Sequence, residues 1–273
     1  MSEYKNLLFI GGGNIAGAVA CGLASSGTVP AEKISVYDID ETKFEKFNKL
    51  GINTFSDLSK AVKNVDFIFL AVKPAIVKSV MEELSHFNEL SDNIVIISFA
   101  AAVEIAHIEK SFGKSIAVIR TMPSTPILVG EGVLAVCKND KVNAKDFQFF
   151  CRMMSSVAHV SVINEDVMNP IIAVHGSSPA YVYLFVKSML DAAQQQGIEP
   201  NVALPLILKT IKGSVTMIEK SDVSIDQLIS NVASPNGTTL AALNSFANDD
   251  FSGAVSRAMA ACAERANQIS KEL

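Results

Sequence analysis

The stretch Leu-Leu-Phe-Ile-Gly-Gly-Gly-Asn-Ile-Ala, residues 7–16, decides the fold of the first half of this chain. Four apolar residues that end directly in glycines predict a short, buried strand of a parallel sheet. The small residues that follow, as far as Ser25, predict a helix packed closely on that sheet. A glycine turn between a strand and a helix is the context in which backbone N–H groups bind phosphate. Residues 7–25 therefore predict the opening unit of a nucleotide-binding domain.

Short apolar runs alternate with helical segments as far as about residue 163. Further strands are predicted at residues 34–37, 66–72, 93–98, 115–120, 132–137 and 158–162. Helices are predicted between them at residues 41–50, 103–111 and 143–155. This alternation is typical of a doubly wound Rossmann domain, α/β in class, with helices on both faces of a parallel sheet.

The chain changes character after about residue 164, where long segments rich in Ala, Met, Leu, Gln and Lys replace the strand-like runs. Helices are predicted at residues 168–196 (one or two), 201–220, 237–244 and 251–272. Their apolar residues fall on more than one face, which favours a second copy of the chain as their cover. We expect two domains, residues 1–163 and an all-helical domain over 164–273, and a homodimer. Whether dimers assemble further is left open.

The composition excludes several classes of protein. Hydrophobic residues make up 49% of the 273 positions and charged residues 19%, which argues against disorder. The net charge is -5 without a basic run, so nucleic acid is not expected as a partner. The longest apolar stretch, residues 94–103, is too short to span a membrane, and no secretory segment opens the chain. Four scattered cysteines without metal-ligand spacing indicate reduced thiols, no metal site and a cytoplasmic protein.

The glycine turn fits the dinucleotide fingerprint Gly-x-Gly-x-x-Gly/Ala. Gly11 permits the tight turn, Gly13 lets the backbone approach a pyrophosphate, and Ala16 allows close packing of helix and strand. The fingerprint follows a predicted strand and opens a predicted helix, and this context makes it specific. Dinucleotide binding is therefore expected here.

Asp38 ends the second predicted strand, where an acidic side chain can bond the ribose 2′-hydroxyl of NADH and repel the 2′-phosphate of NADPH. No Arg lies between residues 14 and 67, although Lys43 and Lys46 are near. Asp38 can alternatively cap the helix that follows. These residues favour NADH slightly and leave the choice between NADH and NADPH open.

Two motifs later in the chain resemble those of a known enzyme family. Gly-Ser-Ser-Pro-Ala-Tyr at residues 176–181 and Ser-Pro-Asn-Gly-Thr-Thr at residues 234–239, together with the glycine turn, resemble the pyrroline-5-carboxylate reductase family. The family forms are usually Gly-Ser-Gly-Pro-Ala-Tyr and Ser-Pro-Gly-Gly-Thr-Thr, so Ser178 and Asn236 depart from them. The resemblance covers nearly the whole chain. It implies an oxidoreductase of proline biosynthesis that reduces a C=N bond with NADPH or NADH, and dimers formed by interlocked C-terminal helices.

The resemblance also implies the site residues. The substrate carboxylate is expected on the backbone N–H groups of residues 237–239, and the Thr239 hydroxyl is expected to bond the ring nitrogen in a catalytic role. Read without the resemblance, the same threonines are an ordinary helix cap. The substrate-binding residues it implies are Ser178, Pro179, Gly237, Thr238 and Thr239. The cofactor-binding residues expected are Gly11, Gly12, Gly13, Asn14, Ile15, Ala16, Asp38, Ala71, Val72, Lys73, Pro74, Met122 and Pro123.

Three other functions compare with this one. A β-hydroxyacid dehydrogenase would carry Gly-x-x-x-Asn-x-x-Lys, but from Gly176 those positions hold Ala180 and Tyr183. Ser124, like Ser178 and Asn236, departs from the family in a site loop, which keeps open an imine reductase of different specificity or a non-catalytic regulatory paralogue that binds dinucleotide. His175 is not assigned a proton, because the imine can take one from solvent. Feedback by proline is left open.

Overall fold

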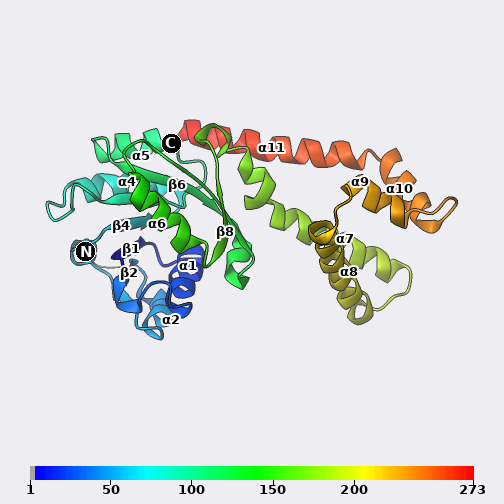
Figure 1. The fold of residues 1–273 in the computed structure, drawn as a ribbon, viewed down its shortest axis with the longest axis horizontal. Coiled ribbons are helices and arrows are strands. Elements are labelled where there is room, and N and C mark those ends of the chain that lie inside the picture. The colour runs from blue at the N-terminus through cyan, green and yellow to red at the C-terminus, as the bar shows by residue number, and fades with distance from the viewer. Residues whose placement is uncertain (1–3) are drawn as a thin grey trace. The chain divides into compact units, whose positions relative to one another are not determined.

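The structure is a computed structural model, and it describes residues 4–273. The expectation about the start of the chain also covered residues 1–3, which lie outside the described residues. Two compact units are present: one runs to Ser177 and includes Cys262–Leu273, and the other is Ser178–Ala261. Each is described by itself below (Figure 1).

The first unit is built on an eight-stranded sheet in the order β3-β2-β1-β4-β5-β6-β7-β8. The strands are β1 (Leu7–Ile10), β2 (Ile34–Tyr37), β3 (Asn53–Phe55), β4 (Phe67–Leu70), β5 (Val95–Ser98), β6 (Ala117–Pro123), β7 (Gly132–Lys138) and β8 (Ala158–Val162). All neighbours are parallel except β6 and β7. The predicted doubly wound α/β class is therefore confirmed.

The antiparallel pair follows from a short connection. β6 and β7 are joined through a 3₁₀ turn, Thr125–Val129, that ends at Gly130 with φ +77°. A parallel return needs a crossover of a dozen residues or more, and this connection is too short for one. β7 therefore runs back along β6, and β8 then pairs parallel to β7.

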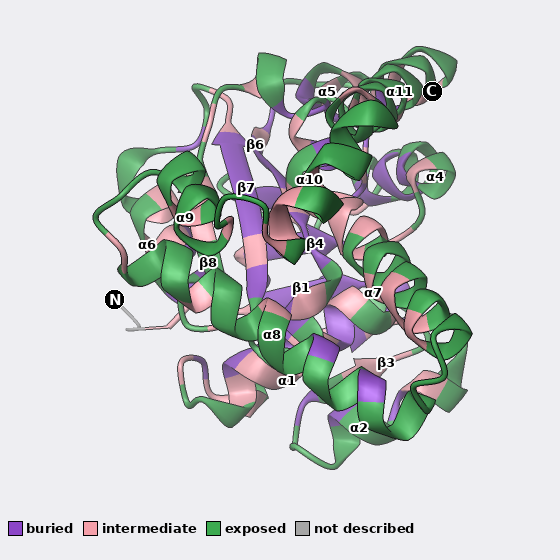
Figure 2. Ribbon diagram, turned by 90° about the vertical axis from the view of Figure 1, so that its right-hand side faces the viewer, coloured by how far each residue is buried: buried purple, intermediate pink, exposed green. Residues whose placement is uncertain are grey.

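Helices cover both faces of this sheet: α1 (Asn14–Ser25), α2 (Glu45–Asn48), α3 (Leu58–Ala61), α4 (Pro74–Ser85), α5 (Ile105–Phe112) and α6 (Ala144–Met154). Alternate residues of each central strand enter different cores. Leu7 and Phe9 pack in one, and Leu8 and Ile10 pack in the other. Since both faces are covered, the strands are continuously apolar, and Figure 2 shows the central strands largely buried.

Some predicted elements differ from the structure. The helix expected at 41–50 is broken into a 3₁₀ turn, Glu41–Lys43, and the single turn α2. The sequence reading missed β3, α3, α4 and α9 (Ile225–Val232). β3 and α3 are too short to show a period. Pro74 occupies the first turn of α4, where proline is well tolerated.

The second unit is helical: α7 (Ser178–Gln195), α8 (Pro200–Lys220), α9, α10 (Thr238–Asn248) and the first part of α11 (Phe251–Glu272). Few of its residues are buried (Figure 2). Many of its exposed side chains are large and apolar. Residues 164–177 pack with the sheet unit, where Met168 and Ala173 are buried. The boundary between the two compact units thus lies after Ser177. The division into a dinucleotide-binding domain, residues 1–163, and a helical domain, residues 164–273, stays a prediction.

Within residues 4–273, no helix combines the length and apolarity needed to cross a membrane. Over the same residues, no cluster of three or more His, Cys, Asp or Glu side chains is gathered in a way that could hold a metal ion.

Candidate functional site

The glycine turn connects β1 to α1 at the carboxyl edge of the sheet. Gly11 has φ +103° and donates its N–H to the Tyr37 carbonyl at 2.8 Å. A Cβ on Gly11 would lie 2.6 Å from the Ala71 carbonyl oxygen. Both the backbone angle and the close approach require glycine at this position.

Gly13 and the start of α1 offer room for a phosphate. A Cβ built on Gly13 meets no atom within 4 Å, so the backbone is open on that side. Gly13 is the N-cap of α1 and, in the described chain, no side chain caps the N–H groups there. Exposed backbone donors at a helix N-terminus are suited to a pyrophosphate, so the residues present fit a dinucleotide. Ala16 is buried against the sheet, as the fingerprint requires.

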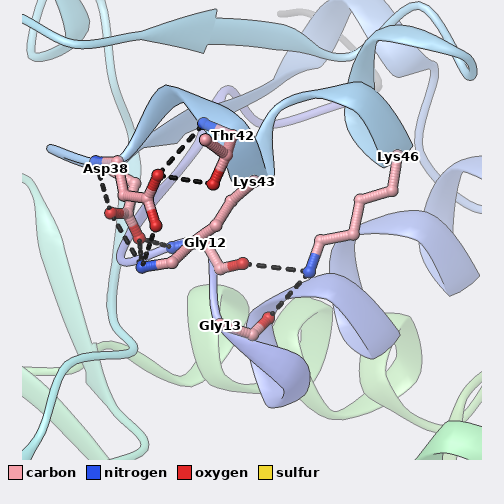
Figure 3. A network of polar contacts seen from close by, with 7 residues as sticks. Gly12, Gly13, Asp38, Thr42, Lys43 and Lys46 are labelled. Carbon is pink, nitrogen blue, oxygen red and sulfur yellow. Dashed lines mark hydrogen bonds and ion pairs between the residues drawn. The ribbon is translucent and has the colours of Figure 1, made fainter.

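Asp38 is buried at the end of β2 and faces the glycine turn (Figure 3). Its Oδ2 accepts the Gly12 N–H at 2.7 Å, and its Oδ1 accepts the Asp40 N–H at 2.9 Å. The Lys43 ammonium donates to both oxygens, at 3.0 and 2.9 Å. Burial acts to raise the pKa of Asp38, but these backbone bonds and Lys43 outweigh it, so the pKa lies below its ordinary value.

Lys46 holds the same turn from the other side. Its ammonium donates to the carbonyls of Gly12 and Gly13 at 3.0 and 3.2 Å, and it lies against Gly17 of α1 (Figure 3). The sequence reading noted Lys46 only as a nearby cation. Its role could not be read locally, because the chain must fold before α2 meets the turn.

Residues 71–74 continue β4 at this edge. The Ala71 N–H donates to the Ile10 carbonyl at 2.9 Å, which holds β4 beside the glycine turn. Lys73 is exposed and is the N-cap of α4. The structure therefore brings residues 11–16, Asp38 and residues 71–74 to one edge of the sheet.

The loop at the end of β6 is braced from within. Arg120 is only 2% exposed and donates to Glu165 at 3.1 Å and to Asn169 at 2.6 Å. The Ser124 hydroxyl accepts the Val133 N–H at 2.9 Å. Because these side chains are committed to protein partners, they hold Met122 and Pro123, between them, in place.

A π-helical turn, Ile172–Gly176, follows in the same unit. Its His175 Nε2 lies 2.8 Å from the Met122 carbonyl oxygen. A Cβ on Gly176 would collide with the Met122 side chain, so glycine permits this close contact. π-turns within helices are frequent at functional sites. This contact could not be predicted from the sequence, because a single π-turn has no characteristic residue pattern.

The motif at residues 234–239 belongs to the second unit, whereas the motif at residues 176–181 crosses the boundary between the units after Ser177. Ser178 and Pro179 open α7, and Gly237 is the N-cap of α10. Asn236 has φ +58°, a left-handed angle that Asn tolerates better than most residues. In the described chain, no side chain caps α10 at Gly237, so the alternative of an ordinary Ser/Thr cap is not what forms. The N–H groups of Thr238 and Thr239 are left for another acceptor, whereas the Gly237 N–H donates to the Ser234 carbonyl at 3.0 Å.

A hollow of about 520 Å³ lies elsewhere, between residues 85–94 and 112–116. It borders the amino ends of β5 and β6, at the opposite edge of the sheet from the glycine turn. It contains none of the candidate residues and is not assigned to the site.

Two family models match the chain. A model described as pyrroline-5-carboxylate reductase dimerisation matches residues 165–269. A second, described as NADP oxidoreductase coenzyme F420-dependent, matches residues 6–102.

Named relatives resemble the chain over nearly all its length. The pyrroline-5-carboxylate reductase of Corynebacterium melassecola is 32% identical, over 96% of this chain and 97% of its own. That of Escherichia coli K12 is also 32% identical, over 98% and 99%. Among solved structures, pyrroline carboxylate reductase of Plasmodium falciparum with NADP bound has a TM-score of 0.89 at 31% identity, covering 99% of this chain and 100% of that one.

Proposed function

The chain belongs to the pyrroline-5-carboxylate reductase family, and on this basis we propose that it reduces 1-pyrroline-5-carboxylate to L-proline, the last step of proline biosynthesis. The observation that carries the proposal is the likeness to named reductases over both units at once. It is an oxidoreductase acting on a C=N bond with a nicotinamide dinucleotide. The glycine turn, whose open backbone fits a pyrophosphate, supports the cofactor independently of the relatives.

When bound, the reduced nicotinamide supplies the hydride for the imine carbon. The residues of this chain bind and orient the two molecules. We assign the pyrophosphate to residues 11–16, the adenosine ribose to Asp38, and the rest of the cofactor to residues 71–74 and to Met122 and Pro123. Two observations support this proposal. Residues 11–16, Asp38 and residues 71–74 lie at one edge of the sheet, and hydrogen bonds of Arg120 and Ser124 hold the loop after β6 in place.

We assign the substrate carboxylate to the backbone N–H groups of Thr238 and Thr239, and to that of Gly237 only if it leaves the Ser234 carbonyl, to which it donates at 3.0 Å. The uncapped start of α10 supports this, since a carboxylate there accepts several N–H bonds and lies at the positive end of the helix dipole. The Thr239 hydroxyl is assigned to the ring nitrogen, where it orients the imine for hydride attack. Ser178 and Pro179 are assigned to the substrate from the start of α7.

The helical domain, which we take as residues 164–273, joins two copies of the chain into a homodimer. Its many exposed apolar side chains agree with a surface that a second copy covers. We keep residues 1–163 as the dinucleotide-binding domain and a cytoplasmic location as predictions.

For the cofactor we propose a slight preference for NADH over NADPH. Asp38 carries a negative charge where the 2′-phosphate of NADPH would lie, and its lowered pKa keeps the carboxylate ionised at neutral pH. A solved relative contains NADP, so we expect this chain to bind NADPH as well as NADH.

The test is to follow oxidation of NADH and of NADPH separately by the purified protein, with and without pyrroline-5-carboxylate. Substrate-dependent oxidation with proline as product is expected, with a somewhat higher kcat/KM for NADH. A folded protein that binds dinucleotide but turns over neither would contradict the reductase and favour the regulatory paralogue. Turnover of other cyclic imines in preference would favour a reductase of different specificity.

A further inference from the structure

All the hydrogen-bond acceptor positions of the Asp38 carboxylate are occupied. An ionised carboxylate offers about four lone-pair sites. Each oxygen of Asp38 takes one backbone N–H, from Gly12 or Asp40, and one bond from the Lys43 ammonium. A ribose hydroxyl can therefore bond Asp38 only by replacing one of these donors.

Lys43 is the donor that can leave. The N–H groups of Gly12 and Asp40 are fixed by the backbone, whereas Lys43 is a flexible side chain that is 39% exposed. It stands on the short turn Glu41–Lys43 (Figure 3). Lys46, by comparison, is engaged with the Gly12 and Gly13 carbonyls and is not bonded to Asp38.

Lys43 also changes the charge that a 2′-phosphate would meet. An unpaired carboxylate repels a phosphate dianion, and the effect is large when the carboxylate is buried. With Lys43 attached, the charge of Asp38 is neutralised, and the ammonium, which has three N–H donors, keeps one for a phosphate oxygen. Asp40 lies 4.0 Å from the same ammonium, so a second carboxylate stands beside the Asp38–Lys43 pair.

We propose that Lys43 is the specificity-determining residue of the cofactor site: attached to Asp38 it admits NADPH, and drawn off Asp38 it leaves a carboxylate that selects NADH. This inference rests on the proposed dinucleotide site and predicts that the proposed preference for NADH is only slight. It makes selectivity a property of the Asp38–Lys43 pair rather than of Asp38 alone.

The test measures binding rather than turnover. Dissociation constants of NADH and NADPH are determined from the fluorescence of the reduced nicotinamide, without substrate, which is simplified because the chain has no Trp. In Lys43→Met the ratio Kd(NADPH)/Kd(NADH) is expected to rise about tenfold, since a cation beside the 2′-phosphate is lost. Lys43→Arg, which keeps the charge, is expected to hold the ratio within about threefold of the wild type.

Lys49→Met is the matched control, because Lys49 makes a surface pair with Glu45 nearby and should leave the ratio unchanged. Asp38→Asn provides a second test, in which the ratio should fall about tenfold as the repelling charge is removed. A Lys43→Met protein that loses affinity for both cofactors equally, or keeps the wild-type ratio, overturns the proposal, as does an unchanged ratio in Asp38→Asn. Absence of imine reduction with these binding shifts intact would count against the proposed reaction and not against Lys43.

Discussion

The contact between His175 and the Met122 carbonyl acts at the scale of a single residue. A carbonyl oxygen only accepts, so the Nε2 atom at 2.8 Å carries the proton and donates it. That nitrogen is engaged with protein, which agrees with leaving His175 out of the proton transfer. The side chain instead fixes the backbone beside Met122, and within the proposed cofactor site we assign the nicotinamide end of the cofactor to this segment.

We predict that His175→Leu weakens NADH binding and lowers kcat, whereas His175→Gln, whose amide N–H can reach the same carbonyl, restores most of both. A lost hydrogen bond of this kind costs about 1 kcal/mol, or roughly fivefold in affinity. Affinity for ADP-ribose, which lacks the nicotinamide, should stay at the wild-type value in both variants. Titrations with NADH and ADP-ribose check this, and equal losses for both ligands would show that His175 only stabilises the fold.

Thr239 provides a second test at this scale. Thr239→Ala should lower kcat/KM for imine reduction roughly 100-fold, because the hydroxyl that orients the ring nitrogen is lost. Dinucleotide affinity should remain nearly unchanged, since the glycine turn is untouched. Thr216→Ala is the control, because the Thr216 hydroxyl bonds only the carbonyl of Lys212 within α8. Collapse of cofactor binding in Thr239→Ala would contradict the placement of this loop at the substrate.

The lowered pKa of Asp38 predicts how stability depends on pH. A carboxyl group whose pKa is lower in the folded than in the unfolded chain stabilises the fold above its ordinary value of 3.8. That contribution is lost as the pH falls below this value through the folded pKa. The free energy of unfolding of the wild type should therefore fall more steeply than that of Asp38→Asn below about pH 4. Urea titrations at several pH values test this, and parallel curves would contradict it.

At the scale of elements, β1, α1 and β4 meet at the glycine turn. Gly11→Ala should destabilise the protein by about 2 kcal/mol or more and abolish dinucleotide binding. The new Cβ would be strained by the positive φ of this residue and would also collide with the Ala71 carbonyl oxygen. Gly27→Ala is the matched control: Gly27 also has positive φ, at +68°, but its Cβ would meet open space. It should cost about 1 kcal/mol and leave binding intact. Equal losses in the two variants would show that the close approach to Ala71 is unimportant.

Some strands can be predicted from their own residues, and others cannot. β1, β4 and β5 were predicted to within two residues at each end, because a central parallel strand is apolar on both faces. The short β3 has no such pattern, and it is specified by pairing with β2. The direction of β7 depends on the length of its connection and not on its own residues.

At the scale of the whole molecule, the helical unit predicts a dimer that can be dissociated. Leu206 and Met217 are 63% and 59% exposed and lie about three turns apart on α8, so they share one face. The double substitution Leu206→Asp and Met217→Asp should shift the protein toward monomer and reduce turnover, because charges cannot be buried unpaired between two copies. Sedimentation velocity measures the change, with Ile76→Asp on α4 as the control. A double variant that stays fully dimeric would place the interface elsewhere on the unit.

Sequence alone determined what depends on neighbouring residues. Local sequence predicts the positions that require glycine, such as Gly11, the apolar strands, and the change to helices after residue 164. The two loop motifs at residues 176–181 and 234–239 identify the family. Only the tertiary structure decided the pairings between distant positions: Lys43 and Lys46 on the turn, His175 on Met122, and Arg120 with Glu165. These contacts depend on the distance and orientation of side chains that folding brings together, and no pattern along the chain encodes either quantity.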